Sequence, residues 1–126
     1  MPTINELQLA KELIRFPTVK TEDKGIMKFL SKKLTAIGFK CTIIKSKGTG
    51  TNPALNLYAR YGKSKPHIMY LGHTDVVANL DNWKFPPFKA VISKGYLNGR
   101  GAQDMKGGVA CWISAVSNFI KNNKFK

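Results

Sequence analysis

In HIMYLGHTDVV, residues 67–77, an apolar run is followed by a glycine and then by a His-x-Asp pair. The run over 67–71 predicts a buried strand, and Gly72 marks its end. His73 and Asp75 are two residues apart, so in extended backbone their side chains lie on the same side. We therefore expect an irregular functional loop at the end of this strand.

Outward from this stretch, helical and strand patterns alternate along the chain. The expected helices span 3–15, 23–37 and 109–120, and the expected strands span 41–44, 55–61, 67–71, 90–93 and 96–97. The last two strands are expected to form a short hairpin around Lys94 and Gly95. Helices before and after strands favour an α/β fold, with layers in the order α-β-α. The 126 residues amount to one domain's worth of chain. Because a sheet of this kind needs further strands to cover the wide apolar face of the last helix, we expect residues 1–126 to be part of a larger domain.

The charge balance raises nucleic acid as a possible partner, because 21 Lys and Arg residues stand against 7 Asp and Glu residues, for a net charge of +14. Only Arg15, Arg60 and Arg100 are arginines, the residue type that binds guanine and phosphate in a bidentate manner, and the lysines are scattered along the chain. Neither a zinc-finger spacing nor an aromatic ribonucleoprotein signature is present. We therefore expect no nucleic-acid partner. A basic, non-enzymatic polyanion-binding module remains the alternative from another functional class.

The sequence also predicts a compartment. No apolar run approaches the roughly 18 residues that a membrane span needs, and the first residues lack the layout of a signal peptide. Cys41 and Cys111 lie far apart in apolar stretches, which predicts free, buried thiols in a reducing environment. We expect a cytoplasmic protein that does not associate with membranes.

A second candidate for chemistry is the glycine-rich stretch GRGAQDMKGG, residues 99–108. Its start is similar to a dinucleotide-binding fingerprint, but Asp104 occupies the place of the third glycine, where a carboxylate repels pyrophosphate. A phosphate-binding loop of the Walker type is excluded because glycine follows Lys106. What remains is an acid among glycines, where the backbone can pack closely around a cation. With His73 and Asp75 on the other loop, Asp104 suggests a divalent metal site, and a helix cap is its alternative role.

These residues resemble a known family. The motifs are HTDVV (73–77), Trp83 with PF (87–88), GRG (99–101) and DMKGG (104–108). Together they are similar to the M20 family of two-zinc amidohydrolases and peptidases, and the resemblance covers nearly the whole chain. Softer matches at FPTV (16–19), TED (21–23) and NLYAR (56–60) favour a member that acts on succinyl substrates. The alternative within the family is a deacylase of N-acetylornithine or of another N-acyl amino acid.

The resemblance implies a reaction and a role for each site residue. His73 is expected to ligate one metal ion, Asp104 to bridge both ions, and Asp75 to orient the His73 imidazole as a catalytic residue that does not bind metal. The implied cofactors are two divalent metal ions, zinc or alternatively cobalt. The implied reaction is hydrolysis of N-succinyl-LL-2,6-diaminopimelate to succinate and LL-2,6-diaminopimelate, in lysine and diaminopimelate biosynthesis.

The departure from the family pattern is at the C-terminal end. The family's glutamate base, its further acidic ligands, a distant histidine and its dimerisation domain all belong beyond the last helix. Within these 126 residues no glutamate follows Glu22, and His67 lies about 20 Å from His73 if the strand is extended. We therefore expect residues 1–126 to be the N-terminal part of the catalytic domain, inactive alone, and the full-length enzyme to be a homodimer.

Overall fold

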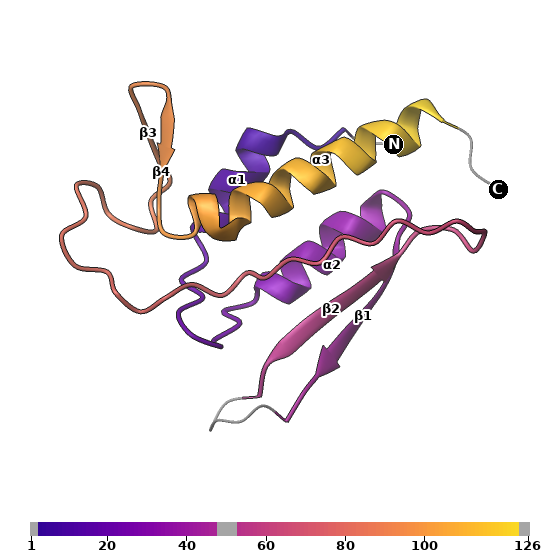
Figure 1. Ribbon diagram of the computed structural model, residues 1–126, viewed down its shortest axis with the longest axis horizontal. Coiled ribbons are helices and arrows are strands. Elements are labelled where there is room, and N and C mark those ends of the chain that lie inside the picture. The colour runs from indigo at the N-terminus through magenta and orange to yellow at the C-terminus, as the bar shows by residue number, and fades with distance from the viewer. Residues whose placement is uncertain (1–2, 48–52, 124–126) are drawn as a thin grey trace.

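The structure is a computed structural model, and it describes residues 3–47 and 53–123. The elements, in chain order, are α1 (Glu6–Ile14), α2 (Ile26–Ala36), β1 (Lys40–Lys45), β2 (Leu55–Arg60), β3 (Val91–Ser93), β4 (Tyr96–Asn98), an irregular turn (Ala102–Lys106) and α3 (Gly107–Asn122). Figure 1 shows α1 beside α3 on one side of the molecule, and α2 with the β1–β2 hairpin on the other. The chain is mixed α/β, as the sequence predicts.

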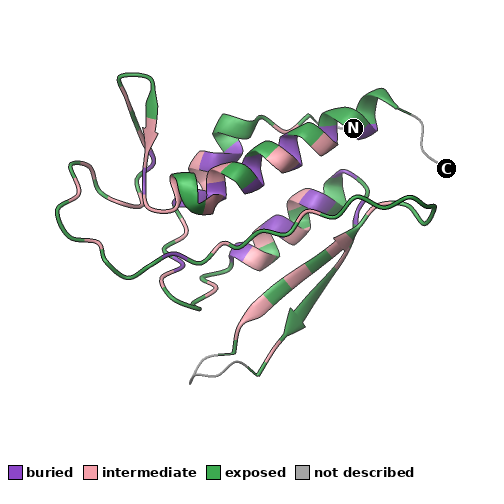
Figure 2. Cartoon of the chain, in the orientation of Figure 1, coloured by how far each residue is buried: buried purple, intermediate pink, exposed green. Residues whose placement is uncertain are grey.

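The core is formed by the three helices and by the residue that leads into β1. Apolar faces at helical spacing bury one stripe of each helix, while the opposite stripes stay exposed (Figure 2). The buried members are Leu9, Ala10, Leu13, Ile26, Leu30, Leu34, Ile37, Phe39, Val109, Ala110, Ile113 and Ile120. Ser114 on α3 also donates a hydrogen bond to the carbonyl of Ile4 (2.7 Å), which joins α3 to the entry of α1.

Two antiparallel hairpins supply the strands. β1 pairs with β2 in a register that sets Lys40 opposite Arg60 and Lys45 opposite Leu55. β3 pairs with β4 around Lys94 and Gly95, both at positive φ (51° and 80°). Two consecutive residues at positive φ suit a tight hairpin turn. The short hairpin expected from the sequence is therefore confirmed.

The strand predicted over 67–71 is wrong. These residues form no ladder with any described part of the chain, and Ile68, Met69 and Leu71 are 95%, 82% and 85% exposed. An apolar run becomes a strand only when the backbone of a neighbouring strand pairs with it. Among the described residues β2 pairs with β1 alone, so it does not pair with residues 67–71. The segment is instead an unpaired stretch that passes between α3 and the layer of α2 and β2 (Figure 1).

Two smaller expectations also need correction. Cys111 is exposed and Cys41 is half-buried, so the thiols are free but are not buried. The apolar neighbours of Cys111 face the core, whereas Cys111 itself, about 100° further round α3 than Ala110, faces outward. None of the helices in the described ranges is long and apolar enough to cross a bilayer.

Candidate metal centre

His73 lies in a loop that has no helix or strand of its own. Residues 61–90 contain only turns, bends and a single parallel bridge between Val76 and Val19. The loop over 72–77, called the His73 loop below, turns the imidazole toward solvent, and the side chain is 47% exposed. The expected irregular loop is therefore present, although the strand before it is not.

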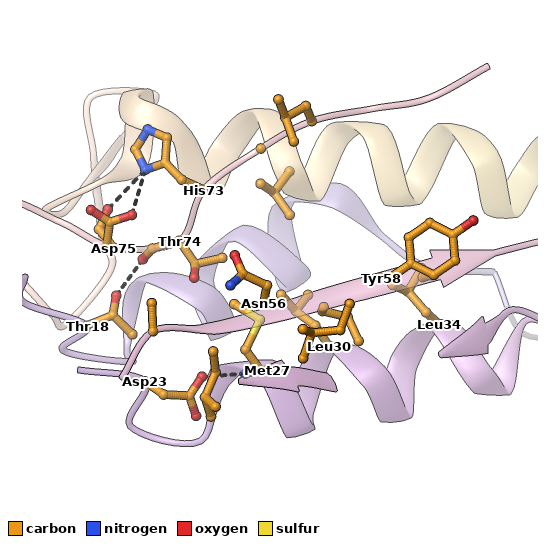
Figure 3. A pocket seen from close by; sticks show the side chains of 18 of the residues that line it. Thr18, Asp23, Met27, Leu30, Leu34, Asn56, Tyr58, His73, Thr74 and Asp75 are labelled. Atoms are coloured by element: carbon orange, nitrogen blue, oxygen red, sulfur yellow. Dashed lines mark hydrogen bonds and ion pairs between the residues drawn. The ribbon is translucent and has the colours of Figure 1, made fainter. Parts of the chain in front are cut away.

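Asp75 faces one nitrogen of the His73 ring. The Nδ1 atom of His73 lies 3.3 Å from Oδ1 of Asp75 and 3.2 Å from the Asp75 backbone carbonyl oxygen (Figure 3). Both oxygens can only accept a hydrogen bond, so Nδ1 is the nitrogen that carries a hydrogen. The side-by-side placement predicted from the His-x-Asp spacing is confirmed in the geometry.

Asp104 faces the other nitrogen. It lies in the irregular turn Ala102–Lys106, called the Asp104 turn below, and its backbone is extended (φ −121°, ψ 94°) where the helical path is broken. Its Oδ1 lies 3.0 Å from Nε2 of His73, across 31 residues of sequence. The fold therefore brings together the three residues that the sequence singled out from two separate loops.

The alternative role of Asp104 as a helix cap finds no support. The residue in the N-cap position of α3 is Lys106, and no side chain caps that helix by a hydrogen bond. The carboxylate of Asp104 is 84% exposed and turned to His73 instead. Its position therefore fits a ligand better than a structural cap.

The contact between His73 and Asp104 fits either a hydrogen bond from a protonated Nε2 or a metal ion bound between the two atoms. A neutral imidazole with its hydrogen on Nδ1 presents a lone pair at Nε2, and the Asp104 carboxylate presents a second lone pair 3.0 Å away. Two acceptors at this distance repel unless a proton or a metal ion lies between them. Two ligands of a tetrahedral zinc ion, each at about 2.0–2.1 Å, lie about 3.3 Å apart, close to this separation. The donor pair thus fits a divalent cation.

The pair does not make a complete metal site. Within 3–47 and 53–123 no group of three or more His, Cys, Asp or Glu side chains could hold a metal ion. The residues outside those ranges are MP, GTGTN and KFK, which contain none of these four residue types. The chain therefore offers a pair of donors at this place and not a closed set of metal ligands.

Lys106 is a buried cation next to this site, and the sequence analysis did not predict its role. Its side chain is fully buried, and its Nζ donates a 2.7 Å hydrogen bond to the carbonyl of Phe16. Burial lowers the pKa of Lys106 to about 8, while the negative charge of Asp75 opposes that change. A lysine between glycines just before an apolar helix is the only sequence signal for it.

Thr18 is a second residue that the sequence did not reveal. It is 1% exposed, and its hydroxyl donates a 2.5 Å hydrogen bond to the carbonyl of Thr74, between His73 and Asp75 (Figure 3). The sequence around it, FPTV, served only as one of the softer matches to the family. His67, which the sequence excluded from the site, lies with its Nε2 3.3 Å from the guanidinium of Arg60.

An open pocket of about 480 Å³ lies beside the site. Apolar residues of α2 and β2, including Leu30, Leu34 and Tyr58, form one end, and His73 and Asp75 lie at the polar end (Figure 3). Its lining includes the ring of His73 but not Asp104. The pocket is therefore adjacent to the donor pair and does not enclose it.

Comparison with known proteins gives both sequence relatives and structural neighbours. A family model described as "Peptidase family M20/M25/M40" matches residues 69–126. Proteins called succinyl-diaminopimelate desuccinylase from Pelagibacter ubique, Rhodospirillum rubrum and Bradyrhizobium diazoefficiens are 52%, 44% and 43% identical over 98%, 90% and 93% of this chain. The matches cover 33%, 29% and 31% of those proteins, so the chain spans about a third of their length.

Two solved structures share the fold. Human carnosine dipeptidase 1 matches with a TM-score of 0.81 at 24% identity, over 95% of this chain and 29% of its own. The M20 family metallo-carboxypeptidase Sso-CP2 from Sulfolobus solfataricus matches with a TM-score of 0.72 at 22% identity, over 94% of this chain and 28% of its own. Both likenesses show that this chain shares its fold with about 30% of each of those chains.

The sequence matches agree on one family. The M20 model covers both the His73 loop and the Asp104 turn, and the relatives are 43–52% identical, so the chain is similar to the M20 peptidase family over most of its length.

Proposed function

We propose that residues 1–126 are the N-terminal part of the catalytic domain of a two-metal amide hydrolase, with His73 and Asp104 among its metal ligands. The observation that carries the proposal is the 3.0 Å approach of Nε2 of His73 to Oδ1 of Asp104, a separation that suits two ligands of one metal ion. Zinc suits a site of imidazole and carboxylate ligands, and cobalt is the alternative.

The substrate in this proposal is N-succinyl-LL-2,6-diaminopimelate, hydrolysed to succinate and LL-2,6-diaminopimelate, the reaction expected from the sequence. The names of the three curated relatives support it. We place the enzyme in lysine and diaminopimelate biosynthesis in the cytoplasm, as a homodimer when complete. A deacylase of N-acetylornithine is the competing function within the family.

Each site residue has a separate task in this mechanism. Bound divalent ions supply polarisation of the amide carbonyl and a lowered pKa for an attacking water. His73 offers the lone pair of Nε2, because Asp75 keeps the hydrogen on Nδ1 and fixes the plane of the ring. Asp104 supplies negative charge that offsets the positive charge of the ions.

A chimera can test both the metal ligands and the substrate. Residues 1–126 would replace the matching third of the Pelagibacter ubique relative, to which they are 52% identical. We expect the chimera to bind two zinc ions and to hydrolyse the succinyl substrate with a higher kcat/KM than N-acetylornithine. His73→Ala should remove zinc and activity.

The outcomes separate the parts of the proposal. A chimera that folds and binds zinc but prefers N-acetylornithine would disprove the substrate and leave the metal ligands standing. A chimera in which His73→Ala retains full zinc content would disprove the metal ligands.

A further inference from the structure

The two loops that carry the candidate ligands both contact a third segment. This segment is FPTVK, residues 16–20, and is called the bracing segment below. It follows α1 in the chain, and it contacts both the His73 loop and the Asp104 turn. The proposed function does not assign it a task.

On one side, the bracing segment holds the His73 loop by three hydrogen bonds. The hydroxyl of Thr18 donates to the carbonyl of Thr74 (2.5 Å). The amide of Val76 donates to the carbonyl of Thr18, and the amide of Lys20 donates to the carbonyl of Val76 (both 2.9 Å). The bonded residues of the loop are Thr74, between His73 and Asp75, and Val76, which follows Asp75.

On the other side, the bracing segment holds the Asp104 turn. The buried Nζ of Lys106 donates to the carbonyl of Phe16 at 2.7 Å, and Lys106 lies two residues from Asp104. The two loops also touch each other, because a Cβ on Gly101 would lie 2.7 Å from Cγ1 of Val76. The three parts therefore pack without space for adjustment.

The bracing segment is itself fixed to the helices. The ring of Phe16 packs against Phe29 of α2 with centroids 5.2 Å apart, and Pro17 restricts the backbone. Hydrogen bonds from the amides of Thr18 and Val19 to the carbonyls of Phe16 and Pro17 (2.9 and 2.8 Å) tighten the turn. A rigid segment thus contacts both loops at once.

We propose that the bracing segment sets the separation of His73 and Asp104, and that Thr18 is a positioning residue for the metal centre; this proposal rests on the function proposed above. Loops are more mobile than helices or strands, yet metal ligands need placement to within about 0.5 Å. The hydroxyl of Thr18 fixes the peptide between the ligand His73 and Asp75, so it acts on the ligand geometry through the backbone.

Thr18→Val in the 126-residue chain is the main test, because it removes the hydroxyl and changes neither shape nor charge. Ser117→Ala is the matched control: Ser117 is also 1% exposed, and its hydroxyl bonds Ser114 and Ile4 between α1 and α3, away from both loops. Thr18→Ser restores the donor.

Two readouts distinguish positioning from stability alone. In the metal-free chain, we expect Thr18→Val to speed hydrogen exchange at the Val76 amide and to weaken the nuclear Overhauser effect between the His73 ring and Asp104. With Zn²⁺ added alone, the shift of the His73 ring resonances should give a Kd raised about tenfold, in the range for loss of a partner that orients a ligand. Thr18→Ser and Ser117→Ala should stay within about twofold of the wild type.

The results that overturn the proposal are specific. Thr18→Val and Ser117→Ala may differ in stability, but equal Zn²⁺ affinity and equal His73–Asp104 contact in both would show that Thr18 is only structural. If Zn²⁺ does not shift the wild-type His73 resonances, the proposed function is wrong. The hydrogen-exchange rate at Val76 and the His73–Asp104 contact then still test whether the bracing segment positions the two loops. If Thr18→Val does not fold, Lys106→Met breaks the other contact, and an unchanged His73–Asp104 contact there contradicts the proposal.

Discussion

Asp75 and Asp104 contact opposite nitrogens of the same imidazole, and this difference separates their roles at the residue scale. Asp75 faces Nδ1, which carries the hydrogen, so its carboxylate acts on the ring and not on a cation. Asp104 faces Nε2, the nitrogen that would bind a metal ion in the proposed site. An asparagine at either position keeps the shape and removes the charge, so the two substitutions test these roles directly.

The zinc content of the chimera should respond differently to the two substitutions. We expect Asp75→Asn to lower zinc affinity or activity about 10–100-fold. The amide oxygen of asparagine still accepts a hydrogen bond from Nδ1, but it raises the basicity of the imidazole less than a carboxylate does. We expect Asp104→Asn to lose zinc and activity together, because the negative charge between the ions is gone. Metal analysis of both purified variants measures the difference. Full zinc content in Asp104→Asn, with a stability loss of only about 0.5–2 kcal/mol, would support a helix cap instead.

Lys106 gives the metal-free chain a pH dependence of stability. Below pH 8 the amine is protonated in both the folded and the unfolded state, and the folded state carries the cost of burying the charge. Between about pH 8 and 10.5 the folded protein has released the proton and the unfolded chain keeps it, so unfolding takes up a proton and becomes less favourable as the pH rises. The stability that the low pKa of Lys106 provides is therefore present at high pH and lost as the pH falls through 8.

Denaturant unfolding at pH 7.5, 9 and 10.5 should show this effect. We expect the free energy of unfolding of the wild type to rise by about 2–3 kcal/mol relative to Lys106→Met across this range. The comparison with Lys106→Met is needed because burial raises the pKa of Tyr70. This raised pKa makes the free energy of unfolding of both proteins fall as the pH rises. A difference between the two proteins that stays constant with pH would contradict a lowered pKa for Lys106.

Among the helices and strands, sequence patterns predicted the features that depend on residues close together in the chain. The apolar stripes of α1, α2 and α3, the positions of β1 and β2 and the turn at Gly95 all follow from spacing and turn chemistry. The segment 67–71 shows the limit of this reasoning, because a strand requires a partner that the pattern of the run cannot supply. The ligands His73 and Asp104 were recognisable by residue type and motif, but Thr18 and Lys106 act through contacts 56 and 90 residues away in sequence.

The packing of the Asp104 turn against the His73 loop predicts a large cost for Gly101→Ala. Gly101 has φ +82°, and an added Cβ would lie 2.7 Å from Val76 and 3.3 Å from Lys106. Gly95 has nearly the same φ (+80°), but nothing lies within 4 Å of an added Cβ, so Gly95→Ala is a control for backbone strain alone. We expect Gly95→Ala to cost about 1–2 kcal/mol and Gly101→Ala about 1–3 kcal/mol more. Equal unfolding midpoints for the two variants would show that the two loops are not closely packed.

For the molecule as a whole, the net charge and the matches to known proteins favour different functions. The net charge of +14 favours contact with polyanions, and within the described residues only Lys24–Glu22 and Lys33–Glu12 pair a lysine with a carboxylate. Against this, the motifs and the relatives are those of the M20 family, which favours the hydrolase that we propose. Tight binding of duplex DNA that weakens steeply with salt, together with a chimera that hydrolyses no acylated amino acid, would favour the polyanion-binding alternative.

The metal affinity of the isolated chain follows from its complete inventory of ligands. The 126 residues contain two histidines, seven carboxylates and two cysteines, and in the described ranges the candidate ligand atoms that meet are Nε2 of His73 and Oδ1 of Asp104. Structural zinc sites use four protein ligands and catalytic sites three, so two donors on exposed loops leave water to complete the shell. We therefore expect calorimetry to find weak zinc binding without defined stoichiometry for the chain, and two tightly bound ions for the chimera. Two tightly bound zinc ions per 126-residue chain would show that these loops hold more ligands than His73 and Asp104, and the division of the metal centre between this chain and the rest of the enzyme would then be wrong.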